Sequence, residues 1–366
     1  MLRFVLCLVP CFAWAQVEQG PANAGFMPEF DGQTRTDSLP ASSIEVSIFS
    51  EGLDFPWGIA PLPDGGFLVS ERGGLLKRLG ADGGLVGIVS GLPDVAAVRQ
   101  GGLLDVAVSP AFDTDRLVYW TYAKPFDGGT ALAAAQGILD EITLTQVVEI
   151  FVQDPVLNSG QHYGSRIIPT QDGVWITTGD RGSPELAQGD NTVGKIIWID
   201  RDGPRVWSSG HRNIQGATVR DGTLWTVEHG PRGGDELNQP EDGLNYGWPV
   251  VSYGINYGGS DVGDGIAVSD GYEPPVYYWD PVIAPGGMAA YPEDGAHEAW
   301  RGNLFVSSLR PGGVMRLELD DGHVVGEEHL LADVGRVRDV EVLDNGDLLV
   351  LPDALGADIL RVSPLP

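Results

Sequence analysis

Short segments of apolar or alternating apolar and polar residues recur along the chain, and each follows a turn rich in Asp and Gly. Alternation with a period of two is typical of a half-buried strand, whereas stretches with the 3.6-residue period of an amphipathic helix are scarce. The turn-and-strand phrase occurs six times, at spacings of roughly 50, 57, 50, 81 and 43 residues. The copies are LPDGGFLVSERG (62–73), FDTDRLVYWTYA (112–123), PTQDGVWITTGDRG (169–182), VRDGTLWTVEHG (219–230), WRGNLFVSSLRPGG (300–313) and LDNGDLLVLPD (343–353).

Further strands follow these copies, for example GGLLKRL (73–79), KIIWID (195–200), GGVMRLEL (312–319) and ADILRVS (357–363). A unit of about 50 residues made of short antiparallel strands cannot bury both of its faces alone, so such units stack radially. We therefore predict an all-β fold, a six-bladed β-propeller, in which IEVSIF (44–49) completes the last blade and closes the ring. A β-sandwich with long loops is the alternative, although a sandwich does not require a recurrent turn.

The segments outside the repeats suggest the domain organisation. Arg3, an apolar run and the small-x-small sequence Ala13-Trp14-Ala15 predict a signal peptide over residues 1–15. Residues 16–42 lack periodicity and are expected to form a flexible lead-in, so the propeller domain would span residues 43–366. The 81-residue spacing indicates an insertion at about 231–290, rich in Gly, Tyr and Trp, and long insertions in compact β domains are often functional.

Charge and cysteine content narrow the possible partners and the compartment. The net charge is −29, from 51 acidic and 22 basic residues, which disfavours binding to nucleic acid or to anionic lipid. Both cysteines, Cys7 and Cys11, lie within the predicted signal peptide, so the mature chain would fold without disulfides. No second apolar run is long enough to insert into a membrane. We expect a periplasmic or secreted protein.

Four segments at expected blade ends contain the candidate chemistry. They are QHYGSR (161–166) with TGD (178–180) after it, GHRNIQG (210–216), EHGPRGGDELN (228–238) with NYGWP (245–249), and GRVRD (335–339). Arginines beside glycines suit a planar carboxylated ligand, because the guanidinium binds carboxylates bidentately. Acidic side chains and carbonyls in a Gly-rich loop suit calcium. Each segment alone also has a structural interpretation, and no dinucleotide turn, nucleophilic serine elbow or zinc spacing is present.

Five segments resemble the soluble sugar dehydrogenases that depend on pyrroloquinoline quinone (PQQ), in particular the aldose sugar dehydrogenase branch. They are RQGGLLDVA (99–107), HYGSRI (162–167), GHRNIQG, EHGPRGGDELN and NYGWPVVSYGINYGG (245–259). The similarity extends from about Gly52 to about Val362. The resemblance implies a six-bladed propeller that oxidises aldose sugars at the anomeric carbon to lactones, with hydride transfer to PQQ and with Ca²⁺ as a second cofactor.

The resemblance also implies roles for individual residues. His162 matches the catalytic base, and Asp180 matches the acid that orients it. Gly230 and Pro231 match backbone ligands of the catalytic calcium, while Glu236 and the carbonyl of Tyr246 match a second, structural calcium site. The matches to cofactor contacts are Gln100, Arg212, Asn213, Tyr257, Ser308, Leu309, Arg310, Arg336, Val337 and Arg338. Arg310 stands where the family is expected to have lysine, which leaves the geometry of that contact open.

Two other functions remain possible at this stage. One is a propeller of the same family that has lost redox activity and acts as a binding module; the retained His162, Asp180 and arginines argue against it. The other is a lactonase-type propeller hydrolase, which would need calcium held by side-chain carboxylates and Asn on the axis. The expected partners are an aldose substrate and an external electron acceptor, and the chain is expected to be a monomer or a homodimer.

Overall fold

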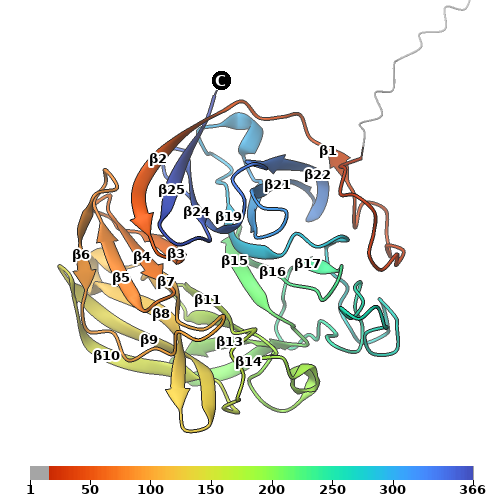
Figure 1. The fold of residues 1–366 in the computed structure, drawn as a ribbon, viewed down its shortest axis with the longest axis horizontal. Helices are drawn as coiled ribbons and strands as arrows, with labels where there is room; N and C mark the ends of the chain where they lie inside the picture. The colour runs from red at the N-terminus through yellow and green to blue at the C-terminus, as the bar shows by residue number, and fades with distance from the viewer. Residues whose placement is uncertain (1–15, 366) are drawn as a thin grey trace, which may run out of the picture.

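Six antiparallel β-sheets surround a central axis in the computed structural model, which describes residues 16–365 (Figure 1). The predicted signal peptide, residues 1–15, lies outside the described residues. The first blade consists of β3 (Pro56–Pro61), β4 (Phe67–Glu71), β5 (Leu75–Leu79) and β6 (Leu85–Val89). The second consists of β7 (Leu103–Val108), β8 (Leu117–Phe126), β9 (Gly129–Asp140) and β10 (Thr143–Val152). The third consists of β11 (Gly164–Pro169), β12 (Val174–Thr178), β13 (Lys195–Asp200) and β14 (Gly203–Ser209).

The other three blades complete the ring. The fourth blade consists of β15 (Ile214–Arg220), β16 (Thr223–Glu228), β17 (Asp235–Asn238) and β18 (Tyr277–Trp279). The fifth consists of β19 (Pro285–Ala290), β20 (Leu304–Ser308), β21 (Val314–Asp320) and β22 (His323–Leu330). The sixth consists of β23 (Val337–Val342), β24 (Leu348–Pro352), β25 (Ala357–Pro364) and β2 (Ile44–Leu53). The six-bladed propeller is thus confirmed, and the sandwich is wrong. As predicted, the early strand closes the ring: β2 pairs antiparallel with β25, with Ile44 opposite Pro364.

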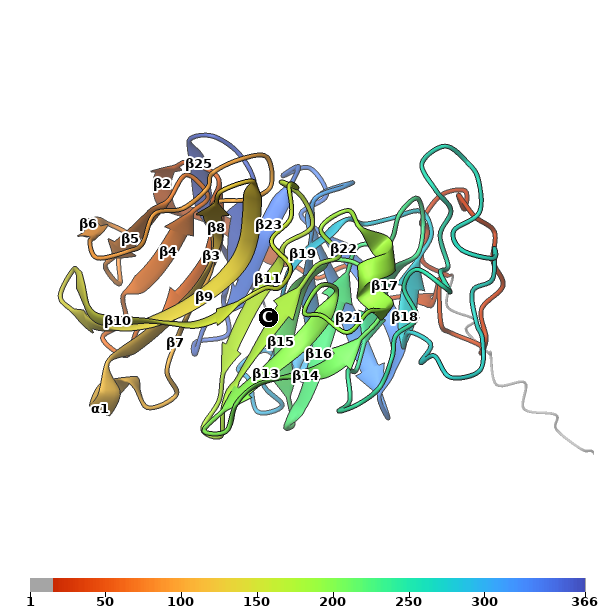
Figure 2. The ribbon, with the colours of Figure 1, turned by 90° about the horizontal axis from the view of Figure 1, so that it is seen from below.

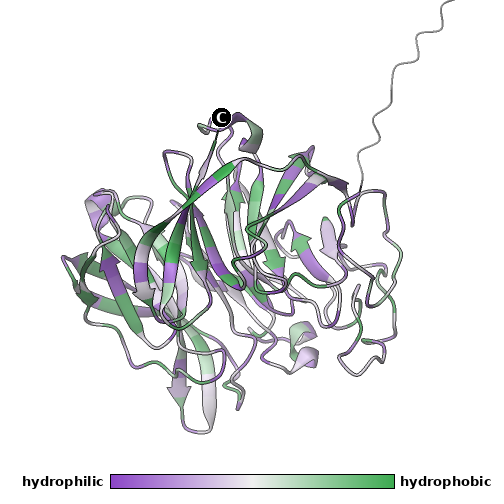
Figure 3. Cartoon of the chain, turned by 45° about the horizontal axis from the view of Figure 1, so that its top comes forward, coloured by the Kyte–Doolittle hydropathy of each residue, from purple (hydrophilic) through white to green (hydrophobic). Residues whose placement is uncertain are grey.

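The apolar core lies between neighbouring sheets, and apolar residues are distributed along the strands of every blade (Figure 3). Successive side chains of a strand point to opposite faces, and both faces are packed: Leu68 of β4 lies in one apolar cluster, and Phe67 and Val69 lie in another. Large aromatic side chains contribute much of it, each burying about 150–250 Å². Trp120, Trp225, Trp279 and Trp300 are each at most 1% exposed. Among the described residues, helical structure is limited to α1 (Phe112–Asp115) and two 3₁₀ turns, Pro184–Gln188 and Glu298–Trp300. Over residues 16–365, no helix is long and apolar enough to cross a membrane.

Every inner strand (β3, β7, β11, β15, β19 and β23) contains a register shift against its neighbour. Such bulges redirect side chains, here toward the axis. At three of these bulges, a hydroxyl group of the second strand accepts a hydrogen bond from the inner strand and donates one to the next blade. Thr121 Oγ1, for example, accepts the Asp105 N–H at 3.0 Å and donates to the Ser165 carbonyl of the next blade at 2.7 Å. Ser70 and Thr177 make the corresponding pairs of bonds.

The lead-in over residues 16–42 is attached to the propeller, which differs from the expected flexible segment. Strand β1 (Asp37–Ser38) pairs parallel with β22. The Asp280 carboxylate accepts the backbone N–H groups of Asn23 at 2.7 Å and Ala24 at 2.9 Å, and Gln33 is fully buried. Polar contacts of this kind leave no hydrophobic periodicity in the sequence, which explains why the attachment was not predicted.

The predicted insertion is shorter than its expected bounds of 231–290. Strands β17, β18 and β19 lie within that range, so the long connection covers residues 239–276. It lies beside the N-terminal segment at the edge of the molecule (Figure 2). Arg232, at the start of the range, donates to Asn23 Oδ1 at 3.2 Å. The N-terminal segment therefore supports the loops that follow β16.

Candidate functional site

A cavity of about 260 Å³, here called the site cavity, lies where the inner strands begin. The bulges of the inner strands, the loops that precede these strands and the residues that follow the second strands supply its walls, so residues far apart in the sequence converge at one end of the axis. The lining residues are Trp57, Arg72, Gln100, His162, Arg212, Asn213, Gln215, His229, Tyr257, Ala284, Leu309, Arg336 and Arg338.

His162 and Asp180 form the ion-pair geometry expected of a base and the acid that orients it. His162 Nδ1 lies 2.7 Å from Asp180 Oδ1, so Nε2 is the ring nitrogen that this contact does not occupy. His162 has a positive φ of 51°, an uncommon conformation for a residue other than glycine. Its backbone N–H donates to Gln100 Oε1 at 2.7 Å. A side chain at Gly179 would lie 2.1 Å from the His162 carbonyl oxygen, so glycine is needed there.

The Asp180 carboxylate is fixed from several sides. Gly182 N–H donates to Oδ1 at 2.7 Å, and the Trp248 indole donates to Oδ2 at 2.9 Å. Burial alone would raise the pKa of Asp180, but the hydrogen bond and charge of His162 and the charge of Arg212 together lower it below its ordinary value. An ionised Asp180 can therefore hold the proton on Nδ1 and stabilise a positive imidazole.

Four arginines contribute a positive charge to the cavity wall. Arg336 Nε donates to Asp353 Oδ2 at 3.0 Å, and Arg338 Nη2 approaches the same oxygen at 3.4 Å. The two guanidinium groups outweigh burial and lower the pKa of Asp353. Within residues 16–365, the buried Nε groups of Arg212 and Arg338 have no hydrogen-bond acceptor. Unsatisfied buried donors beside a cavity fit an anionic ligand with several acceptor oxygens.

Gln215 and His229 connect the arginines inside the wall. Gln215 Oε1 accepts Arg338 Nη1 at 2.7 Å and lies 3.2 Å from His229 Nε2. Burial, followed by the charges of Arg212 and Arg338, lowers the pKa of His229 well below its ordinary value. His229 is therefore a neutral polar contact and adds no charge to the site.

The structure brings most of the predicted cofactor contacts to the cavity, but not all. Gln100, Arg212, Asn213, Leu309, Arg336 and Arg338 line it, as does Tyr257, which is 74% exposed. The Ser308 hydroxyl instead donates to the Ile283 carbonyl at 2.7 Å, and the Val337 side chain lies in the apolar core. Arg310 is exposed and lies outside the lining residues. Contacts from Ser308 and Val337 to a ligand would have to come from their backbones.

Five lining residues were not predicted. Gln215 and His229 lie inside motifs that were singled out, GHRNIQG and EHGPRGGDELN, but only their neighbours were assigned roles. Arg72 is the next-to-last residue of the first repeated phrase, and the scarcity of basic residues in this chain was a usable signal for it. Nothing local distinguishes Trp57 or Ala284, which reach the cavity through a bulge and through a loop with a positive φ of 48° at Ala284.

The predicted ligands of the catalytic ion lie directly after His229. Gly230 begins a tight loop, in which its N–H donates to Asp235 Oδ1 at 2.7 Å. Asp235 Oδ2 accepts the N–H of Ala284, which joins this loop to the cavity wall. No hydrogen bond within residues 16–365 occupies the carbonyl oxygens of Gly230 and Pro231. Free carbonyl oxygens at a fixed turn fit a calcium ligand set.

Glu236 and Tyr246 lie around a second group of oxygens. Asn238 Nδ2 donates to Glu236 Oε2 and to Glu228 Oε1, both at 3.3 Å, while its buried Oδ1 has no donor among the described residues. Burial and the charge of Glu228 raise the pKa of Glu236 well above its ordinary value. Tyr246 stacks on His211, whose Nδ1 lies 2.9 Å from Glu228. In the described chain, no three His, Cys, Asp or Glu side chains form a metal-site cluster.

Known proteins with the same architecture place the chain in a family. An aldose sugar dehydrogenase of Escherichia coli is 36% identical over 348 residues, which cover 88% of this chain and 94% of the relative. The apo crystal structure of the soluble E. coli enzyme, 35% identical, superimposes with a TM-score of 0.83 over 88% of this chain and 100% of the other. A PQQ-bound aldose sugar dehydrogenase of Streptomyces coelicolor, 27% identical, has a TM-score of 0.71 over 89% of this chain and 99% of the other. Residues 53–361 match the glucose/sorbosone dehydrogenase family, to which this chain belongs.

Proposed function

We propose that this protein is a PQQ-dependent aldose sugar dehydrogenase that oxidises the anomeric carbon of an aldose to a lactone. The observation that carries the proposal is the His162–Asp180 pair, 2.7 Å apart, at a cavity lined by four arginines. A base that faces an anion-binding wall fits a carboxylated redox cofactor and a hydroxylated substrate. The PQQ-bound relative from S. coelicolor supports the choice of cofactor.

The wall residues fit the carboxylates of PQQ. Arg212 and Arg338 have unsatisfied Nε donors, and Arg72 and Arg336 add charge at the same cavity. Among the described residues that line the cavity, none carries a carboxylate that would repel such a ligand. The nearby Asp353 is paired with Arg336 and Arg338. When bound, PQQ supplies a quinone that accepts hydride, a chemistry that no side chain of this chain offers.

In this proposal, His162 is the general base. Its Nε2 takes the proton of the anomeric hydroxyl as the C1–H bond breaks and the hydrogen leaves with its electron pair. The C1–O bond gains double-bond character, which gives the lactone, and His162 carries one positive charge. Asp180 holds Nδ1–H and stabilises that charge through a 2.7 Å hydrogen bond.

The carbonyl oxygens of Gly230 and Pro231 would hold a calcium ion, and Glu236 and Tyr246 a second one. The ion held by Gly230 and Pro231 would supply Lewis acidity to the reacting carbonyl group. The ligand set at Gly230 and Pro231 is neutral, so the ion would be held partly by the cofactor. Turnover also needs an external electron acceptor, and we propose that the mature protein acts in the periplasm or outside the cell.

The direct test uses the mature chain stripped with a chelator and then supplied with PQQ, calcium or both. We expect aldose oxidation, followed with an artificial dye acceptor, only when both are present. Full activity with PQQ alone after chelation would contradict the role of the ion. Absence of PQQ binding, measured by quenching of tryptophan fluorescence, would contradict the proposed function.

A further inference from the structure

A second cavity, here called the lower cavity, lies on the same axis beyond the site cavity. It measures about 340 Å³ and is lined by the later residues of all six inner strands, including Asp105, Arg166, Asp339 and Glu341. Trp57, Gln215 and Arg338 line the site cavity from the earlier residues of three of these strands. The two cavities share no lining residue. A layer of side chains at Arg166 therefore separates them.

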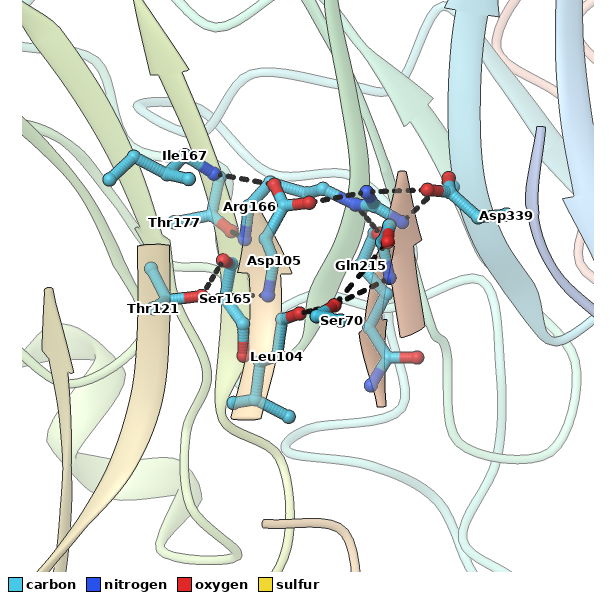
Figure 4. Close-up of polar contacts among 12 residues, drawn as sticks. Ser70, Leu104, Asp105, Thr121, Ser165, Arg166, Ile167, Thr177, Gln215 and Asp339 are labelled. Atoms are coloured by element: carbon cyan, nitrogen blue, oxygen red, sulfur yellow. Dashed lines mark hydrogen bonds and ion pairs between the residues drawn. The ribbon is translucent and has the colours of Figure 1, made fainter. Parts of the chain in front are cut away.

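The Arg166 guanidinium holds this layer together, between Asp105 on one side and Asp339 on the other (Figure 4). Nη1 donates to Asp105 Oδ1 at 2.9 Å, and Nη2 donates to Asp339 Oδ1 at 2.9 Å. Nε donates to the Gln215 carbonyl oxygen at 2.6 Å. One buried side chain of the third blade thus joins the second, fourth and sixth blades.

The remaining two blades pack against the same group. The Trp57 ring of the first blade has its centroid 4.6 Å from Arg166 Cζ. On the fifth blade, a Cβ atom at Gly287 would lie 1.6 Å from Asp339 Oδ1 and 2.6 Å from Arg166 Nη2, so only glycine fits there. All six inner strands therefore meet at Arg166 and its carboxylate partners.

This layer supports the floor of the site cavity, which we define as Trp57, Gln215 and Arg338. The Trp57 ring lies near both arginines, with Arg338 Cζ 5.8 Å from its centroid. Gln215 accepts Arg166 Nε through its backbone and Arg338 Nη1 through its side chain, the latter at 2.7 Å. Burial would lower the pKa of Arg166, but Asp105 and Asp339 outweigh it and raise that pKa. The group therefore stays charged.

We propose that Arg166 is a positioning residue of the cofactor site: with Asp105 and Asp339 it closes the axis between the two cavities and fixes the floor against which the carboxylated cofactor binds. This inference rests on the proposed function. The guanidinium is required, because its planar fork reaches Asp105, Asp339 and the Gln215 carbonyl at once, whereas the single ammonium of a lysine cannot. Arg166 itself lies outside the lining of the site cavity and does not contact the reacting atoms.

The test compares PQQ affinity and thermal stability in Arg166→Lys and in a matched control, Arg316→Lys. Arg316 is also buried and ion-paired, with Nε 2.7 Å from Glu328 Oε2, but it lies in the fifth blade outside both cavities. Both variants should melt at a lower temperature. Only Arg166→Lys should weaken PQQ binding, by about tenfold, the size of one misplaced charge-assisted hydrogen bond. Binding is measured by fluorescence quenching with calcium present and sugar absent.

A milder variant keeps the test decisive if Arg166→Lys does not fold. Asp105→Asn leaves the bonds of Arg166 to Asp339 and Gln215 in place, and should weaken PQQ binding less than the lysine variant but more than Arg316→Lys. Parental affinity in the folded Arg166→Lys variant, or in Asp105→Asn when the former does not fold, overturns the inference. So does failure of both variants to fold, because Arg166 would then be structural only. A parent that binds no PQQ contradicts the proposed function as well.

Discussion

The site cavity and the lower cavity lie at opposite ends of the same six inner strands, yet their charged linings are of opposite sign. The site cavity is lined by Arg72, Arg212, Arg336 and Arg338, with no carboxylate among its lining residues. The lower cavity is lined by Asp105, Asp339, Glu341 and Asp344, with Arg166 as its single arginine. Among the described residues that line either cavity, only the arginines of the site cavity have unsatisfied cationic donors, which suit an anion.

The difference shows how a propeller places function at one end of its axis. Arg338 and Asp339 are consecutive in the sequence, but they line different cavities. Arg338 lines the site cavity, and Asp339 lines the lower cavity. The register shift between Val337 and Asp339 allows both side chains to point toward the axis rather than to opposite faces of the sheet. A bulge thus supplies a cation to one cavity and an anion to the layer beneath it.

The largest expected effect concerns the chemistry of the site cavity. His162→Gln keeps the approximate size and one hydrogen-bonding group but cannot take a proton, so kcat should fall by about 10²–10⁴. PQQ binding should persist, because in the proposed site the arginines would contact the cofactor independently of the base. Parental turnover with normal PQQ binding would show that His162 is not the base, and loss of folding would show that it is structural. Turnover is followed with a dye acceptor, and binding by fluorescence quenching.

The next effect concerns the charge of the site cavity. Arg338→Ala removes a buried cation and should weaken PQQ binding by about ten- to a hundredfold, since a hydrogen bond to a charged group contributes roughly 1.5–3 kcal/mol. Turnover at saturating PQQ should fall much less. Arg316→Ala, which removes a buried arginine of the fifth blade, controls for lost stability and should leave affinity unchanged. If the PQQ concentration at half-saturation is unchanged in Arg338→Ala, this arginine does not contribute to cofactor binding.

The fold could be predicted because each blade repeats the same local chemistry. Asp-Gly turns such as Asp172-Gly173 connect the inner strand to the second strand, and alternation marks the strands themselves. The closing strand was predicted at Ile44–Phe49 from its apolar and polar pattern, although no turn phrase precedes it, and in the structure β2 continues to Leu53. Segment 16–42 was not, because Gln33 and its neighbours attach by hydrogen bonds that leave no periodic pattern.

The site was predictable where a motif keeps its residues together and the family resemblance names their roles. His162 and Asp180 were singled out in this way, and the structure places their side chains 2.7 Å apart. Trp57 and Arg166 were not assigned roles, because their placement depends on bulges. A shift of one residue reverses the face to which a strand side chain points, and nothing in the local sequence marks where it occurs.

The smallest expected effect concerns the lower cavity and its excess of carboxylates. Burial, followed by the charge of Asp339, raises the pKa of Glu341 from 4.5 to about 8, although Arg166 opposes the shift. Between these values the native state keeps a proton that the unfolded state has lost, so native stability falls as the pH rises through this window. Glu341→Gln cannot ionise and should escape that loss.

The melting temperature of Glu341→Gln relative to the parent should therefore increase steadily from about pH 5 to about pH 8 at constant ionic strength. Glu318→Gln, at an exposed position of β21, is the matched control and should show a difference that does not change with pH. A constant difference for Glu341→Gln as well would mean that Glu341 ionises in the native state as readily as in the unfolded chain. The lower cavity would then tolerate another negative charge, and the contrast in charge between the two ends of the axis would carry no cost in stability.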